Sequence, residues 1–243
     1  MKSFNDMVHK YERNIPAFSD FLGLAEISDF YLFLKDYPNL PYELFGGAPE
    51  CERKILKIGN AETLGYDLPF PIKLIEISPK NSRFADELTH RDFLGALMNL
   101  GIERDTLGDI LIRDNKAFLF CEENMAPFIL SNLSRVRHTT VVCKAVEELP
   151  PIPATEYEEK LVQVASMRLD LVISKAYNLS RTASSELFRT GRVFVDGRLC
   201  ENSSHELKSG QLVSVRGFGR LEIKEIKGLS RKGKTNLILN ITK

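Results

Sequence analysis

The sequence contains no tryptophan, only four cysteines and no long apolar run. The cysteines, at positions 51, 121, 143 and 200, form no CxxC pair. A zinc site needs paired ligands at short spacing, so we expect reduced thiols of a cytoplasmic protein and no metal. The most apolar stretch, residues 21–34, is too short and too charged to span a bilayer, and residues 1–11 are polar. Neither a membrane location nor a secretory signal is therefore expected.

Catalytic motifs are missing as well. The tripeptide His90-Arg91-Asp92 resembles a kinase catalytic loop, but that loop needs Asn five residues after the Asp, where this chain has Leu97. There is no glycine-rich phosphate loop, and the four histidines show no ligand spacing. The sequence thus predicts a protein that is not an enzyme and has no cofactor.

The net charge of zero hides an uneven distribution along the chain. From Lys160 to Lys243 there are 16 Lys and Arg against 7 Asp and Glu, a net charge of +9. The other residues hold 17 basic and 26 acidic side chains, a net charge of −9. A basic segment of this kind suits a polyphosphate backbone such as RNA. The alternative is a solvated basic face without a partner.

Proline placement and motif order divide the chain into four predicted parts. Three prolines within residues 149–153 exclude a helix or central strand and favour a stiff spacer. Phe30, Phe33 and Leu34 recur at helical spacing and predict a helical front. The parts are a helical N-terminal domain at 1–68, a middle domain at 69–149, a Pro-rich linker at 150–157 and a C-terminal domain at 158–243. The fold class is α+β.

The middle domain alternates strands and helices. Strands are predicted at residues 72–77, 109–113, 116–121 and 139–146, and helices at residues 89–100 and 125–133. This strand-helix-strand-strand-helix-strand order is the ferredoxin-like pattern, which RRM proteins use. Phe118 and Phe120 share one strand face, where they can stack on RNA or belong to the core. The full RRM recognition signature is missing.

Two amphipathic helices open the C-terminal domain, at residues 168–177 and 181–190. The first has a buried stripe at i, i+3, i+4 and i+7, made of Leu169, Val172, Ile173 and Ala176. Ser180 can cap the second helix and Gly191 can end it.

The second helix has one basic and one apolar face. Arg181, Ser185 and Arg189 lie within an arc of about 80°, and Ala183 and Leu187 lie on the far side. An RNA-binding face requires both arginines to point the same way and to be free of carboxylate partners.

The rest of this domain predicts a sheet. Asp196-Gly197 is a hairpin turn between residues 193–195 and 198–200. Further strands are expected at residues 211–216, 221–226 and 235–241, with a basic turn at residues 229–234.

Across roughly fifty residues the C-terminal domain resembles the S4-type (alpha-L) RNA-binding domain. The matching motifs are Arg168-Leu169-Asp170, Ser180-Arg181 with Ala183, Leu187 and Phe188, Gly191-Arg192-Val193, Val195-Asp196-Gly197, Lys208-Ser209-Gly210 and Val215-Arg216-Gly217. The resemblance implies phosphate contacts at Arg168, Lys175, Arg181, Arg189 and Arg192, and secondary contacts at Lys208, Arg216 and Arg220. A guanidinium fork matches phosphate oxygens in pairs.

Several residues have two open interpretations. Asp196 can act only in stabilising the hairpin turn, or it can orient an arginine or form a hydrogen bond with a ribose hydroxyl. Phe188 can edge the core or stack on a base. Possible additional RNA contacts are Arg53 and Lys54, which can equally form a solvated turn, and Arg231, Lys232 and Lys234.

The whole chain resembles the YlmH proteins of Gram-positive bacteria. The motifs are Gly46-Gly47 followed by Glu52-Arg53-Lys54, residues 88–97 (LTHRDFLGAL), Leu100-Gly101-Ile102 and Gly108-Asp109-Ile110-Leu111. Ala48-Pro49 departs from the family, which tends to have an aromatic residue there. The resemblance implies rRNA and tRNA binding on the large ribosomal subunit that holds peptidyl-tRNA, in ribosome-associated quality control.

Three alternatives remain. The protein can be a ribosome maturation factor, a protein-interaction adaptor with an acidic front, or an RNA-modifying enzyme of the pseudouridine synthase type. Met167-Arg168-Leu169-Asp170 is superficially close to the motif that carries the catalytic Asp of those enzymes. No separate catalytic domain of adequate length surrounds it.

Overall fold

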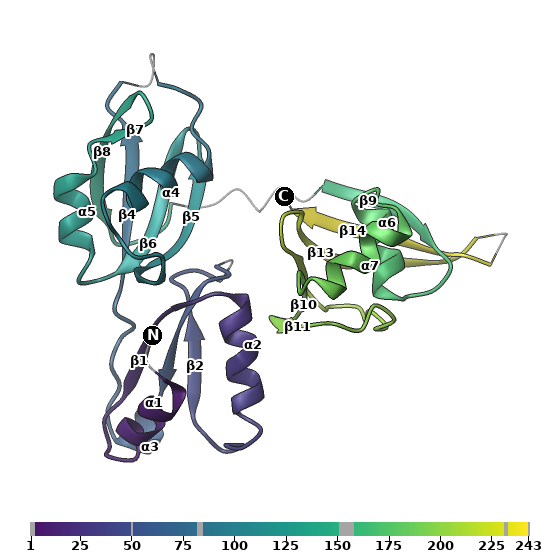
Figure 1. The fold of residues 1–243 in the computed structure, drawn as a ribbon, viewed down its shortest axis with the longest axis horizontal. Helices are drawn as coiled ribbons and strands as arrows, with labels where there is room; N and C mark the ends of the chain where they lie inside the picture. The colour runs from purple at the N-terminus through teal and green to yellow at the C-terminus, as the bar shows by residue number, and fades with distance from the viewer. Residues whose placement is uncertain (1–2, 50, 82–84, 151–157, 231–232, 243) are drawn as a thin grey trace. The chain divides into compact units, whose positions relative to one another are not determined.

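The computed structural model describes residues 3–49, 51–81, 85–150, 158–230 and 233–242. The chain forms two compact units, one made of residues 1–23 and 32–151 and the other of residues 24–31 and 152–243. Helices and antiparallel sheets are mixed throughout, so the α+β class is confirmed (Figure 1). The predicted linker falls on residues 150–157, all but the first of which lie outside the described residues.

The front region contains helices, as predicted, but the prediction of a purely helical domain is wrong because it missed a three-stranded sheet. Its strands form an antiparallel sheet in the order β1-β3-β2. The elements are α1 (Phe4–Tyr11), β1 (Ala17–Leu22), α2 (Leu24–Phe33), β2 (Tyr42–Phe45), β3 (Lys54–Ile58) and α3 (Ala61–Leu64). The strands have only four to six residues, too few for a clear period-2 pattern, whereas the aromatic spacing does produce α2.

The middle of the first unit has the predicted order of elements. Its elements are β4 (Ile72–Pro79), α4 (His90–Asn99), the short 3-10 helix η2 (Arg104–Thr106), β5 (Leu107–Arg113), β6 (Lys116–Glu122), α5 (Ala126–Asn132), β7 (Arg135–Val136) and β8 (Thr139–Val146). The sheet order is β5-β6-β4-β8-β7, with every neighbouring pair antiparallel. At the β5–β6 turn, Asp114 and Asn115 both have positive φ, as a two-residue hairpin turn requires.

The two faces of the middle sheet are both covered. Helices α4 and α5 pack on one face through Phe93, Leu97 and Ile129, which are fully buried (Figure 1). On the other face Phe118 and Phe120 are each only 3% exposed and cluster with residues of the front sheet, Phe21 and Ile55 among them. Stacking of these two phenylalanines on RNA is therefore ruled out, because they form the core that joins the front sheet to the middle sheet.

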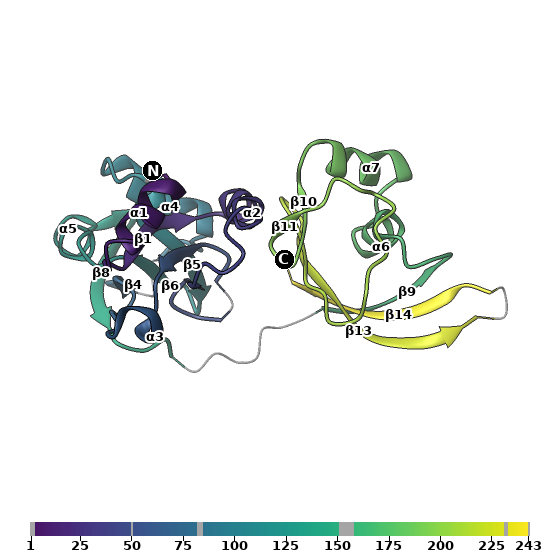
Figure 2. The same cartoon turned by 90° about the horizontal axis from the view of Figure 1, so that it is seen from below.

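The second unit contains a six-stranded antiparallel sheet in the order β11-β10-β12-β13-β14-β9. The elements are β9 (Glu158–Val164), α6 (Leu169–Ala176), α7 (Arg181–Arg189), β10 (Val193–Val195), β11 (Arg198–Leu199), β12 (Val213–Val215), β13 (Gly219–Leu229) and β14 (Thr235–Thr242). Sequence reasoning missed β9, which pairs with β14 along the sheet edge. Helices α6 and α7 lie together on one face of this sheet (Figure 2).

Candidate nucleic-acid interface

Helix α6 is fixed by its apolar stripe and by a loop that caps its first turn. Leu169, Val172, Ile173 and Ala176 are all buried, as predicted. The backbone N–H groups of Leu169 and Asp170 donate to the carbonyls of His205 and Ser203 at 2.8 and 3.1 Å, so two donors that a helix start leaves open are satisfied.

Both ends of α6 carry cations. At the start, the Arg168 guanidinium binds both oxygens of Asp170, at 3.1 and 2.8 Å. Near the end, Lys175 is exposed and has no side-chain partner among the described residues. The Lys160 ammonium donates to the Ala176 carbonyl at 2.7 Å, which stabilises the negative end of the helix. Lys175 is therefore available to an anion, whereas Lys160 serves the fold.

Helix α7 begins at the predicted cap. The Ser180 hydroxyl accepts from the Ala183 N–H at 3.1 Å, and Gly191 follows the last turn with φ +63°. The buried residues are Ser184, Leu187 and Phe188. Phe188 therefore belongs to the core and does not stack on a base. Ala183 is exposed, contrary to prediction, and Ser184 takes the inward place because its hydroxyl donates to the Asp170 carbonyl at 2.7 Å.

Arg181, Ser185 and Arg189 are all exposed, so the outward face of α7 exists as predicted. The condition that both arginines be free of carboxylates holds only for Arg181. Arg189 forms a bidentate pair with Glu186, three residues earlier, with its Nε 2.8 Å from Oε2. The hydrogen bond raises the pKa of Arg189 and lowers that of Glu186.

The condition set by the sequence is therefore only half met, because Arg181 is free of carboxylates whereas Arg189 can meet a phosphate only if its pair with Glu186 opens. The side chains are 77% and 48% exposed, and an ion pair in that setting is weak and screened by salt. The i, i+3 spacing of Glu186 and Arg189 allows this ion pair to be predicted from the sequence. Arg168 is also paired, since its hydrogen bond with Asp170 raises its pKa, and this pair is less open to solvent because the Asp170 side chain is only 14% exposed. At two of the predicted contacts, Arg168 and Arg189, a phosphate would have to compete with a carboxylate.

Arg192 and Arg216 are partly used by the fold. Arg192 Nη2 donates to the carbonyl of Arg216 at 2.6 Å, and its guanidinium carbon lies 5.7 Å from the Phe218 ring centre. A Cβ on Gly217 would lie only 2.4 Å from the same nitrogen. Arg216 lies over the Phe194 ring at 5.0 Å. These contacts hold the two arginines in place and leave fewer donors for phosphate.

Asp196 serves its turn. It has φ +51°, and its carboxylate accepts from the Leu212 N–H at 2.9 Å and from the Gln211 amide at 3.3 Å. No contact between this carboxylate and an arginine is found among the described residues, so the idea that it orients one has no support here.

The remaining predicted contacts of this unit differ in accessibility. Lys208 is exposed, and its backbone N–H donates to the Gln211 side chain. Arg220 is half-buried on β13. Lys234 is exposed beside the turn, and Arg231 and Lys232 lie outside the described residues.

Arg53 has a structural role in the first unit. Its guanidinium donates to the carbonyls of Phe21, Leu107 and Arg104 at 2.6, 2.9 and 3.3 Å. The prediction of an RNA contact at Arg53 is therefore replaced by one of a bridge between the front and middle sheets. Lys54, half-buried at the start of β3, remains a prediction.

Asp170 is engaged by donors within the fold. Its side chain is 14% exposed and accepts from Arg168 and from the Leu171 N–H at 2.9 Å. Within the described ranges no cluster of three or more His, Cys, Asp or Glu is placed to hold a metal ion. No helix in the same ranges is long and apolar enough to cross a membrane.

Comparisons with known proteins show which proteins this chain is similar to. Residues 67–149, the middle of the first unit, match the family described as "Putative RNA-binding domain in YlmH". The chain is also 32% identical over 163 residues to the ribosome-associated protein quality control protein P2 of Bacillus subtilis. The matched residues make up 65% of this chain and 63% of that relative. Both similarities agree with the resemblance to the YlmH proteins that the sequence motifs indicate.

Two further similarities are partial. An uncharacterized RNA pseudouridine synthase of Aquifex aeolicus is 41% identical over 51 residues, 21% of each chain. The cell division protein ylmH from Streptococcus pneumoniae, a solved structure, is 22% identical with a TM-score of 0.47, covering 59% of this chain and 86% of that one.

Proposed function

We propose that this chain is a non-catalytic RNA-binding protein that acts in ribosome-associated quality control. In this role it binds ribosomal RNA and tRNA on the large ribosomal subunit that holds peptidyl-tRNA, in the cytoplasm. The observation that carries the proposal is the outward face of α7. This helix buries Leu187 and Phe188 while Arg181 and Arg189 remain in solvent. The 32% identical relative supports the quality-control setting, since its own name states that role.

The proposed interface has the chemistry of backbone recognition. Its accessible cations are Lys175, Arg181 and Lys208, and Arg168 and Arg189 join them when phosphate displaces their carboxylate partners. Arginine forks and lysine charges contact phosphates without reading base sequence. Structured RNA is recognised mainly through backbone and shape, which suits this set. The helix pair and its sheet constitute the proposed S4-type domain.

We also propose that the middle of the first unit has the ferredoxin-like, RRM-like fold. Its four main strands lie in the order β5-β6-β4-β8. The aromatic face that an RRM uses for RNA is occupied here by the front sheet, because Phe118 and Phe120 are buried against Phe21 and Ile55. Any RNA contact of this domain must therefore use another surface.

The match to a pseudouridine synthase is too short to indicate catalysis. It covers only 51 residues, and Asp170 is occupied by Arg168 and a backbone N–H. Tritium release from uridine-labelled ribosomal RNA would reverse this conclusion.

The proposal is tested by sedimentation of a cell extract on a sucrose gradient, with immunodetection of the protein. We expect it to travel with free large subunits that retain peptidyl-tRNA, and the Arg181→Ala variant to shift toward the top. Glu225→Gln, a charge change at an exposed site of β13 away from α7, is the control. If the parent protein stays at the top in all conditions, the ribosomal role is wrong. Association only with immature subunits would favour a maturation factor.

A further inference from the structure

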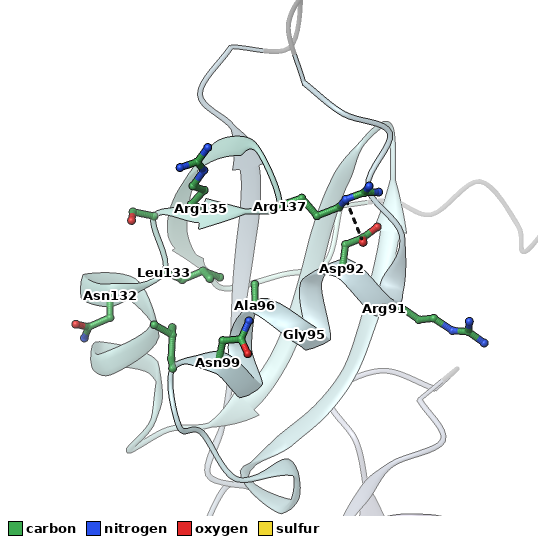
Figure 3. Close-up of a pocket in the computed structure, with 11 residues that line it drawn as sticks. Arg91, Asp92, Gly95, Ala96, Asn99, Asn132, Leu133, Arg135 and Arg137 are labelled. Atoms are coloured by element: carbon green, nitrogen blue, oxygen red, sulfur yellow. Dashed lines mark ion pairs between the residues drawn. The ribbon is translucent and has the colours of Figure 1, made fainter.

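A groove with a volume of about 500 Å³ lies on the helical side of the middle sheet. One wall is a face of α4, where Asp92, Ala96 and Asn99 line it together with Gly95, and the other wall is formed by residues 132–135 and Arg137 (Figure 3). We name this feature the α4–β7 groove. It belongs wholly to the first unit, away from the sheet face that the front sheet covers.

The groove is cationic although its half of the chain is acidic. Arg135 and Arg137 line it against a single acid, Asp92, whereas the side chain of Arg91 at its edge points away from it (Figure 3). Arg137 Nε lies 3.7 Å from the Asp92 carboxylate, which is also held by the Thr89 N–H and hydroxyl at 2.8 and 2.7 Å. Those two hydrogen bonds lower the pKa of Asp92. The acid thus has other hydrogen-bond donors, and the long contact with Arg137 leaves that arginine accessible to a second anion.

Arg137 occupies a backbone conformation that its residue type rarely adopts. It has φ +53°, and of the six non-glycine residues with positive φ in the described ranges the other five are Asn or Asp. A left-handed conformation is costly for a residue other than Gly, Asn or Asp. An arginine at such a position indicates that its side chain matters more there than the local backbone preference.

Gly95 gives an independent indication of a ligand. It lies in the interior of α4, where glycine destabilises a helix relative to alanine. A Cβ built on it meets no atom within 4 Å, so nothing within the described fold requires its small size. Its open side lines the groove. A glycine in this setting allows the backbone of a bound molecule to approach the helix closely.

We propose that the α4–β7 groove binds the phosphate backbone of structured RNA, with Arg135 and Arg137 as the phosphate contacts and Gly95 as the point of close approach. This rests on the proposed RNA-binding function and assigns a surface to the middle domain. The side chains of Asn99 and Ser134 supply neutral hydrogen-bonding groups beside the two arginines. Backbone phosphate and ribose take donors of both kinds.

The first test uses the full chain and ribosomal RNA extracted from large subunits. The double variant Arg135→Asn with Arg137→Asn removes both charges, and Asn tolerates the left-handed backbone at position 137. Each lost contact reduces the dependence of log K on log salt by about 0.7–0.9. We therefore expect the loss of affinity between 50 and 200 mM salt to be roughly tenfold smaller than in the parent. The double variant Lys73→Asn with Lys144→Asn, which removes two exposed cations of β4 and β8 outside the groove, is the charge-matched control.

The second test separates shape from charge. Gly95→Leu should weaken RNA binding while the thermal midpoint of unfolding stays equal or rises, because leucine favours the helix. If the groove variants bind RNA with the affinity and salt dependence of the parent, the groove is not an RNA site.

Arg181→Ala measured in parallel separates the two proposals. Loss of binding in that variant alone overturns the groove and leaves the proposed function standing, and no loss in any variant overturns the proposed function. Normal binding to extracted RNA with weakened binding to intact large subunits would indicate a ribosomal protein as partner and would also overturn the groove proposal.

Discussion

The pair between Arg189 and Glu186 leads to an unusual expectation, that removal of a charged residue strengthens RNA binding. The Glu186 carboxylate accepts hydrogen bonds from Nε and Nη2 of Arg189, and it adds a negative charge to the outward face of α7. In Glu186→Gln the carboxylate is lost while the size of the side chain is kept. Arg189 is then free to contact phosphate, and one source of repulsion disappears. Affinity for structured RNA should therefore rise, most clearly at low salt.

The size of the effect follows from counterion release. One added phosphate contact steepens the decrease of log K with log salt by about 0.7–0.9. Over a fourfold change from 50 to 200 mM salt this corresponds to roughly threefold. The variant should thus bind more tightly than the parent at 50 mM, and its advantage should be about threefold smaller at 200 mM. Arg181→Ala should change the slope by a similar amount in the opposite direction, since Arg181 has no carboxylate to lose.

The assay is fluorescence anisotropy with a labelled ribosomal RNA fragment at four salt concentrations. A double-mutant cycle separates the contributions. Arg189→Ala should have a small effect in the parent and a full one in the Glu186→Gln background. Glu225→Gln controls for net charge. A Glu186→Gln variant with unchanged affinity and slope would show that the α7 face does not meet the RNA backbone.

Three further outcomes are expected. Gly47→Ala should destabilise the first unit by about 2–4 kcal/mol in chemical denaturation, because Gly47 has φ +101° and a Cβ there would lie 2.2 Å from the Phe120 ring; an unchanged midpoint would contradict this packing. Ser180→Ala should cost about 1 kcal/mol through loss of the α7 cap, and Ser180→Gly only a few tenths. Burial raises the pKa of Cys143 to about 11 and that of Cys121 to about 12, from 9.0. Both thiols thus favour the folded state fully below pH 9, and this stability is lost as the pH rises to about 11–12. The parent should lose more stability between pH 8 and 11 than a variant with both cysteines replaced by alanine, in denaturation series at each pH.

The helices of the second unit were predictable because several local rules agree. Ser180 caps α7, Gly191 ends it, and an apolar stripe faces the sheet. Where the local rules did not identify the inward-facing residue, contacts in the tertiary structure determined it. Ser184 rather than Ala183 faces inward, because its hydroxyl finds the Asp170 carbonyl. Helical spacing alone cannot show that partner.

The strands that escaped prediction have weak patterns for physical reasons. In β9 only Val162 and Val164 are buried, because an edge strand has one open side and tolerates charges. In β2 no residue is buried. The burial of Phe118 and Phe120 depends on Phe21 and Ile55, some sixty to a hundred positions earlier, and no local rule connects them.

The distribution of charge gives the two proposed contact surfaces different roles. Residues 160–243 carry a net charge of +9, so attraction between this segment and an RNA is long-ranged and needs no particular geometry. The rest of the chain carries −9, so RNA near it is repelled except where cations gather locally. The α4–β7 groove, with Arg135 and Arg137 against one acid, is such a place. The basic segment would therefore set the rate of encounter, whereas the groove would accept only an RNA whose backbone reaches it in the right orientation. A chain with the basic segment alone should still bind RNA, but with less discrimination between ribosomal RNA and unrelated duplexes.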